Sequence, residues 1–129
     1  MQRKYLNSAP KIYELDYKLI IKKLEEYGNR CTNKGAVLAI LIGSLAKGNY
    51  SPFSDADVII ITEGKKNVID FMEPSFPVDV EPRVYTLDEV YALSIEKKKI
   101  ILEIIQNGII LSGKQSIMEN IRKLYYSNS

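Results

Sequence analysis

The sequence predicts an α/β or α+β fold in which helices pack on a β-sheet. Two short apolar runs, "AVLAILI" at 36–42 and "DADVIIIT" at 55–62, are bounded by turn residues, which is typical of buried strands. Longer segments with apolar residues at helical spacing precede and follow them. The 129 residues suffice for one core, so we expect residues 1–129 to form a single domain.

The first predicted element is a helix over residues 8–30. Ser8 is a suitable N-cap, and Pro10 is tolerated in the first turn. The helix carries one apolar stripe, which consists of Ile12, Leu15, Leu19, Ile20, Leu24 and Tyr27. We expect "GNR" and "NKG" to end the helix, so that the strand at 36–42 follows.

A third strand is predicted in "PVDVEPRVYT", after a short helix in "EGKKNVIDFME". The period of two places four side chains on one face of this strand: Asp79, Glu81, Arg83 and Tyr85. Pro82 removes a backbone donor, so the strand is expected at the edge of the sheet or interrupted there.

The remaining elements are mostly helical. Thr86 and Glu89 have the spacing of a capping box that opens a helix near "LDEVYAL". Another helix, "KKKIILEIIQNG", is expected to stop at Gly108, and a short strand "IILS" and a helix over 114–126 follow. The last two helices contain more apolar residues than one sheet face needs, so we expect an exposed patch among Ile100, Ile104, Ile117 and Ile121.

Composition excludes several functional classes. There is no histidine, which rules out imidazole zinc sites and Ser-His-Asp catalysis. Cys31 is the one cysteine, and we interpret it as a structural thiol because no histidine could activate it. The net charge of +2 is too small to suggest bulk attraction to nucleic acid. Neither a signal-peptide core nor a membrane-spanning apolar stretch is present, so we expect a cytoplasmic protein without membrane contact.

The segment "GSLAKGNYSPFSDAD" at 43–57 is the strongest functional signal. Asp55 and Asp57 are two residues apart on a predicted strand, so their carboxylates share a face and repel each other unless a cation lies between them. Mg²⁺ is commonly bound by one or two carboxylates together with substrate phosphates. Gly43 allows a sharp turn after the first strand, and Ser44 is expected to cap a short helical turn whose N–H groups, with Lys47, favour an anion.

This segment resembles the signature of the DNA polymerase β-like nucleotidyltransferases: Gly-Ser, ten residues, then Asp-x-Asp. The chain is similar to the minimal nucleotidyltransferases (MNT) of that superfamily. The resemblance implies a mixed sheet with helices packed on it and transfer of a nucleoside monophosphate from an NTP, expected to be ATP. It also implies two Mg²⁺ ions as cofactors.

The resemblance also implies roles for individual residues. Gly43, Ser44, Lys47 and Ser54 would bind the nucleotide, although the family often has arginine where this chain has Lys47. Asp55 and Asp57 would bind the metal ions. Asp79 is the first choice for a third metal-binding carboxylate, and Glu81, on the same face, is the alternative.

The acceptor is the open question at this stage. Some minimal nucleotidyltransferases are antitoxins that adenylylate a tyrosine of a helical HEPN-type toxin, so such a partner is expected here. One alternative is a module that binds a nucleotide or a partner without catalysis. Another is a nucleotidyltransferase that acts as a homodimer on a small molecule or RNA. Pyrophosphate release would separate the enzymatic hypotheses from the binding module.

Overall fold

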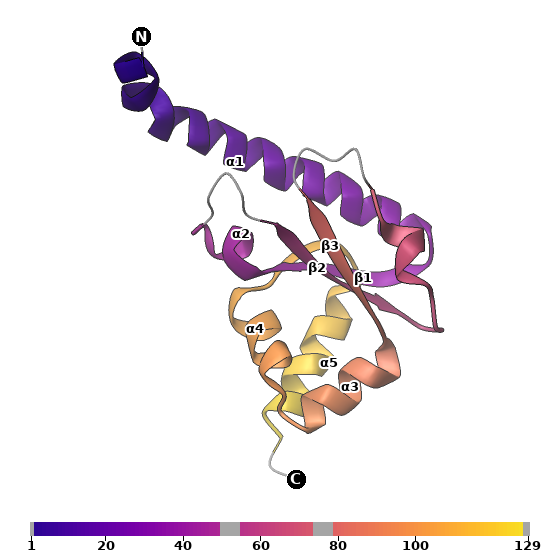
Figure 1. Ribbon diagram of the computed structural model, residues 1–129. Helices are drawn as coiled ribbons and strands as arrows, with labels where there is room; N and C mark the ends of the chain where they lie inside the picture. The colour runs from indigo at the N-terminus through magenta and orange to yellow at the C-terminus, as the bar shows by residue number, and fades with distance from the viewer. Residues whose placement is uncertain (1, 50–54, 74–78, 128–129) are drawn as a thin grey trace.

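A mixed β-sheet lies between two layers of helix in the computed structural model, which describes residues 2–49, 55–73 and 79–127 (Figure 1). Within these ranges the sheet has four strands in the order β3-β2-β1-β4. β1 (Ala36–Ile42) is antiparallel to β2 (Ala56–Thr62) and to β4 (Ile109–Gly113). β3 (Val80–Thr86) is parallel to β2. This arrangement confirms the predicted fold class.

The helices divide between the two faces of the sheet. α1 (Gln2–Asn33) crosses one face, and α3 (Leu87–Ile95), α4 (Lys99–Asn107) and α5 (Gln115–Tyr125) cover the other (Figure 1). The short α2 (Gly43–Lys47) follows β1, and the 3₁₀ helix η1 (Val68–Phe71) lies between β2 and β3 in the chain. Among the described residues, no helix combines the length and apolarity that crossing a membrane would require.

Strand alternation sends neighbouring residues of β1 and β2 into two separate cores. The core under α1 includes Tyr27, Leu41 and Ile60, whereas the core under α3–α5 includes Ile40 and Ile59. Both central strands are therefore buried on both faces, which explains why their sequences are continuously apolar rather than alternating.

Two predictions about helices are wrong. α1 begins at Gln2 rather than at residue 8, and it continues through "GNR" to Asn33. Gly28 is accommodated inside the helix because α1 lies very close to β4 there: a Cβ at this position would stand 2.7 Å from Leu111 Cβ. A residue that usually breaks helices is thus used for close packing.

The exposed isoleucine patch is also not found. Ile104, Ile117 and Ile121 are buried together with residues of β1 and β2, and Ile100 is half-buried against the same cluster. Three helices pack against one another as well as on the sheet, so they bury more apolar surface than the sheet face alone could cover.

β3 occupies the edge of the sheet, as Pro82 predicts. The amide of Ala56 donates a hydrogen bond to the carbonyl of Asp79 at 2.7 Å, so the odd-numbered residues of this segment bond to β2. Pro82 directs its ring nitrogen to the outer edge, where no strand of the described sheet requires a donor.

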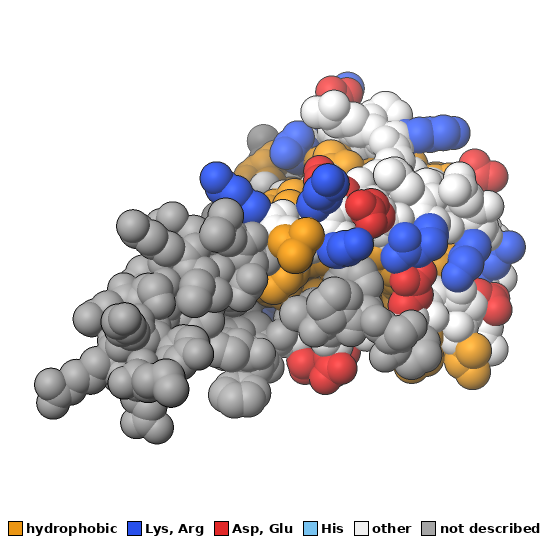
Figure 2. Space-filling model, turned by 90° about the horizontal axis from the view of Figure 1, so that it is seen from above, with side chains coloured by type: hydrophobic (Ala, Val, Ile, Leu, Met, Phe, Trp, Pro, Cys, Tyr) orange, Lys and Arg blue, Asp and Glu red, His pale blue; other side chains and the backbone are white. Residues whose placement is uncertain are grey.

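On the described part of the surface seen from the α1 side, charged side chains of both signs lie side by side. Lys and Arg side chains gather along this face, with Asp and Glu side chains between them (Figure 2).

Candidate active site

The turn after β1 is shaped around Asp57. Gly43 has φ +83°, which places it in the left-handed region that residues with a Cβ rarely adopt. A Cβ on Gly43 would stand only 2.8 Å from Asp57 Oδ2. Glycine is therefore required here both for the sharp turn and for the space that the Asp57 carboxylate occupies, which confirms the role predicted for it in the turn.

The predicted cap of α2 is wrong. Ile42 occupies the N-cap position without a side-chain hydrogen bond, and Ser44 is the second residue of the helix. The helix ends at Lys47, and its C-cap residue Gly48 has φ 78°. Lys47 is exposed in its last turn. Ser54, which the sequence assigned to nucleotide binding, lies outside the described residues.

The two aspartates stand at the start of β2. Asp55 directly precedes the strand and is exposed, whereas Asp57 lies within it and is half-buried. By strand alternation Asp57 shares its face with Ile59, so it lies on the side of α3–α5. In the strand register Asp57 is opposite Ile42, the residue before Gly43, on one side and opposite Glu81 on the other.

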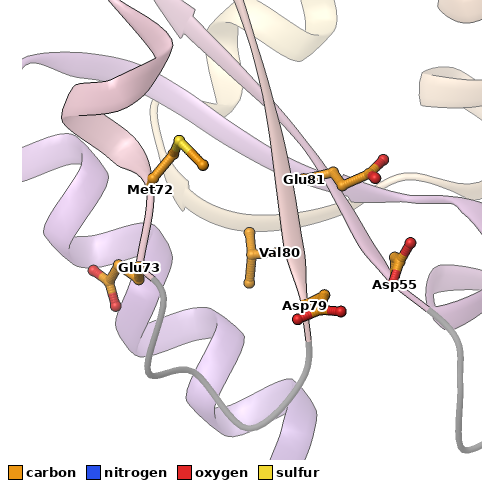
Figure 3. A pocket seen from close by; sticks show the side chains of 6 residues that line it. All are labelled: Asp55, Met72, Glu73, Asp79, Val80 and Glu81. Atoms are coloured by element: carbon orange, nitrogen blue, oxygen red, sulfur yellow. The ribbon is translucent and has the colours of Figure 1, made fainter.

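Two further carboxylates stand at the start of β3. Asp79 precedes the strand and Glu81 lies within it, and both are exposed. Figure 3 shows that their side chains point to the side of β3 on which Asp55 lies, while Val80 points the opposite way, toward α1. Because β2 and β3 are parallel, their first residues meet at one edge of the sheet and bring these carboxylates together.

The donor chemistry of this edge fits a hard divalent cation. Asp55, Asp57, Asp79 and Glu81 offer only carboxylate oxygens, which are the ligands that Mg²⁺ takes in proteins. As the described side chains stand, no three Asp, Glu or Cys residues lie close enough to share one ion. An ion at this edge would therefore be held by one or two of these carboxylates together with substrate phosphates.

A pocket of about 490 Å³ passes around the start of β3. One side of it is formed by carboxylates, namely those of Asp55, Asp79 and Glu81. The other side is formed by Met72, Glu73 and Val80 (Figure 3). The pocket thus connects the carboxylate edge of the sheet with the segment that follows η1.

Contacts with α1 hold this second side of the pocket in place. Tyr27 donates a buried hydrogen bond to the carbonyl of Phe71 at 2.6 Å. Arg30 binds both carboxylate oxygens of Glu73, at 2.8 and 2.7 Å, and holds the pKa of Glu73 below its ordinary value. Lys34 donates to the carbonyl of Asp70 at 3.0 Å. Sequence reasoning missed these residues, because their contacts join segments 36 to 44 residues apart.

Cys31 is a structural thiol, as the absence of a histidine that could activate it suggested. It is 1% exposed within the core under α1. Burial raises its pKa to about 11, so the reactive thiolate is not formed near neutral pH.

The fold and this edge of the sheet define a class of protein. A mixed sheet that brings a glycine turn against paired carboxylates is the arrangement expected of a nucleotidyltransferase. The family model described as polymerase beta, nucleotidyltransferase, matches residues 22–117. The chain therefore belongs to this family and is a nucleotidyltransferase, which implies an NTP substrate and a divalent metal ion.

A solved structure supports the fold assignment. A chain from a structure described as a toxin-antitoxin with AMP-PNP is similar, with a TM-score of 0.56 and 17% sequence identity. The similarity covers 78% of this chain and 86% of that chain. No curated protein gave a significant match.

Proposed function

We propose that this protein transfers AMP from ATP to a hydroxyl group of a protein acceptor in the presence of Mg²⁺. One observation carries the proposal: the strand register places Asp57 between the Gly43 turn and Glu81. A backbone turn that can approach phosphates is thereby adjacent to carboxylates that can bind their metal ions, which phosphoryl transfer requires.

In this proposal Asp55 and Asp57 bind the metal, and Gly43, Ser44 and Lys47 contact the triphosphate. Glu81 provides the third carboxylate and Asp79 is the alternative, an order opposite to the one expected from sequence. The register supports this change because Glu81 lies directly beside Asp57, whereas Asp79 is one position before the first paired residue of β3. When bound, Mg²⁺ supplies charge neutralisation of the triphosphate and activation of the acceptor hydroxyl.

We further propose that the acceptor is a tyrosine of a helical HEPN-type toxin and that this protein acts as its antitoxin. The similar structure is described as a toxin-antitoxin with AMP-PNP, which supports both an adenine nucleotide and a protein partner. The exposure of Asp55, Asp79 and Glu81 supports a large acceptor, since the carboxylate edge is accessible from solvent.

Mass spectrometry of the partner tests the proposal. The protein is purified together with the product of the neighbouring gene and incubated with ATP and Mg²⁺. The partner should gain the mass of one or more AMP groups. Asp57→Asn should reduce this transfer by about 10³-fold or more, because a charged metal ligand becomes a neutral amide. Asp88→Asn, on the exposed first turn of α3, is the matched control and should transfer at the wild-type rate.

Several results would contradict the proposal. If Asp57→Asn transferred AMP at the wild-type rate, the assignment of Asp57 as a metal ligand would be wrong. ATP binding without pyrophosphate release, in the presence of the partner, would instead indicate a non-catalytic binding module. Full turnover of the isolated protein on a small molecule or RNA would overturn the assignment of a protein acceptor.

A further inference from the structure

We propose that Tyr17 is a positioning residue for nucleotide binding. Its hydroxyl donates a hydrogen bond to the carbonyl of Leu45 and thereby sets the orientation in which α2 presents Lys47 to the triphosphate. The inference rests on the proposed function, in which Ser44 and Lys47 contact that triphosphate. Tyr17 acts through α2 and does not itself touch the substrate.

α2 is too short to determine its own orientation. It has five residues, whereas isolated helices shorter than about 12–15 residues are only marginally stable in water. Ile42 at its N-cap position makes no side-chain hydrogen bond to the helix. The orientation of α2 therefore depends on its contacts with the rest of the protein.

Leu45 connects α2 to α1 through two different kinds of contact. Its side chain is 1% exposed in the core under α1, and Tyr17 packs against the same core. Its carbonyl accepts the hydrogen bond from the Tyr17 hydroxyl at 2.8 Å, across 28 positions of the chain. Burial of an apolar side chain is non-directional, whereas a hydrogen bond requires a defined angle. We infer that the bond from Tyr17 fixes the rotation that burial of Leu45 leaves open.

This rotation determines where the proposed nucleotide-binding residues lie. Successive residues of a helix are about 100° apart around its axis, so Lys47 lies about 200° from Leu45, on the opposite side of α2. In agreement with this geometry, Lys47 is exposed and Leu45 is buried. Gly43, at the other end of α2, stands against the carboxylate of Asp57. A rotation of α2 would therefore move Ser44 and Lys47 relative to the residue proposed to bind the metal.

Loss of the Tyr17 hydroxyl should change orientation more than stability. The carbonyl of Leu45 also accepts a hydrogen bond from the amide of Gly48 at 3.2 Å, so it stays paired when the hydroxyl is removed. A lost hydrogen bond is most costly where it leaves a buried group unpaired, and that does not happen here. The loss falls instead on the preorganisation of α2, which nucleotide binding must then restore, and this lowers the affinity.

Nucleotide binding and steady-state kinetics of Tyr17→Phe test the inference. Binding of the ATP analogue AMP-PNP with Mg²⁺ is measured by calorimetry, and AMP transfer to the partner is measured at varied ATP. Tyr17→Phe should bind AMP-PNP about fivefold more weakly and raise the KM for ATP by a similar factor. The kcat should change by less than about twofold, because contacts that position the triphosphate act on the bound substrate and on the transition state alike.

Tyr91→Phe is the matched control. It removes a hydroxyl that accepts a hydrogen bond from Asn120 at 3.1 Å, between α3 and α5. This variant should bind AMP-PNP as the wild type does. An equal loss of affinity in both variants would show a general effect of lost hydrogen bonds and would overturn the inference. A fall in kcat of Tyr17→Phe without a rise in KM would also overturn it, because Tyr17 would then act on the chemical step.

Hydrogen exchange without nucleotide examines α2 directly. The amides of Gly48 and Asn49 donate to the carbonyls of Leu45 and Ser44 and close the end of the helix. They should exchange about fivefold or more faster in Tyr17→Phe than in the wild type, because the end of α2 opens more often when it is no longer held to α1. Unchanged exchange of these amides would overturn the claim that Tyr17 holds α2.

The two proposals fail in different ways. If the wild type binds AMP-PNP but transfers AMP to no acceptor, the proposed function fails, while the affinity of Tyr17→Phe still decides the role of Tyr17. If the wild type adenylylates the partner and Tyr17→Phe does so with an unchanged KM for ATP, the positioning role is wrong while the proposed function stands.

Discussion

The two sides of the pocket are built on opposite physical principles. On the side toward α1, opposite charges and hydrogen-bonding groups are paired, as in the contacts of Arg30 with Glu73 and of Tyr27 with Phe71. On the side toward α3–α5, the strand register gathers carboxylates of the same charge, with Asp57 directly beside Glu81. The α1 side therefore contributes to stability, whereas like-charge repulsion on the carboxylate side opposes it, as is expected if these residues bind cations as proposed.

Among the variants that compare the two sides of the pocket, substitution of the third carboxylate should have the largest effect. Glu81→Gln is expected to reduce Mg²⁺-dependent AMP transfer by roughly 10²–10³-fold, because it removes a metal ligand beside Asp57. Asp79→Asn, at the neighbouring position on the same face, is the matched comparison and should reduce transfer less. The melting temperature without metal should stay the same or rise in both variants, since a like charge is removed.

The ratio of the transfer rates of these two variants decides which carboxylate is the third metal ligand. Pyrophosphate release, measured with the purified partner, gives both rates under the same conditions. A larger loss for Asp79→Asn than for Glu81→Gln would restore the order expected from the sequence. A marked fall in the melting temperature of Glu81→Gln would contradict the view that this side of the pocket opposes stability.

The turn beside Asp57 should show the next largest effect. Gly43→Ala and Gly48→Ala each place an alanine at positive φ, which costs about 1–2 kcal/mol of stability. Only Gly43→Ala also brings a Cβ to 2.8 Å from Asp57 Oδ2, whereas a Cβ at Gly48 meets nothing within 4 Å. We therefore expect similar losses of stability from backbone strain, and a loss of AMP transfer of about tenfold or more for Gly43→Ala alone.

Thermal unfolding and initial rates, measured for both variants, test this difference. Equal activity of the two variants would show that the carboxylate of Asp57 moves aside without consequence. Such a result would contradict the conclusion that the turn is shaped around the Asp57 side chain.

Local patterns in the sequence predicted much of the fold. The runs at 36–42 and 55–62 are buried strands because two helical layers cover both of their faces. The capping box is present, with hydrogen bonds in both directions between Thr86 and Glu89. The edge strand that contains Pro82 and the sharp turn at Gly43 were also predicted correctly, since both depend on backbone constraints that a single residue imposes.

Features that depend on distant contacts were not predictable in the same way. The continuation of α1 through Gly28 depends on its close packing against β4, which no local signal at Gly28 reveals. Burial of Ile104 and Ile117 depends on how three helices meet. The choice between Asp79 and Glu81 depends on a register between strands, and alternation alone places both residues on the same face.

A hydrogen bond on the α1 side should show a smaller effect, and on stability rather than on transfer. Tyr27→Phe removes the buried donor to the carbonyl of Phe71, which should lower the free energy of unfolding by about 1–3 kcal/mol. Tyr126→Phe, at a residue 61% exposed, is the control and should leave stability unchanged. Chemical denaturation measures both variants. An unchanged midpoint for Tyr27→Phe would show that this contact does not hold η1 in place.

The smallest expected effect is the dependence of stability on pH through Glu73. Its bidentate hydrogen bonds from Arg30 lower the pKa of the carboxyl in the folded protein below its ordinary value of about 4.5. The carboxylate therefore adds stability above the pKa of the unfolded chain, and that contribution is lost as the pH falls through the lower pKa of the folded protein.

Glu73→Gln should lower the melting temperature at pH 7 by a few degrees at most, because Arg30 is 45% exposed and water screens the pair. The difference from wild type should shrink as the pH falls below the ordinary pKa of a glutamate, since the wild-type carboxylate becomes protonated as the pH passes through its lowered pKa. Glu96→Gln, which breaks a pair 4.0 Å apart with more than half of each side chain exposed, is the control and should change the melting temperature less at pH 7. A difference for Glu73→Gln that stays constant from pH 7 down to the most acidic pH at which both proteins are still folded would show that its effect is one of packing rather than charge. The contrast between a paired side and a like-charged side of the pocket would then rest on the hydrogen bonds that Tyr27 and Lys34 donate.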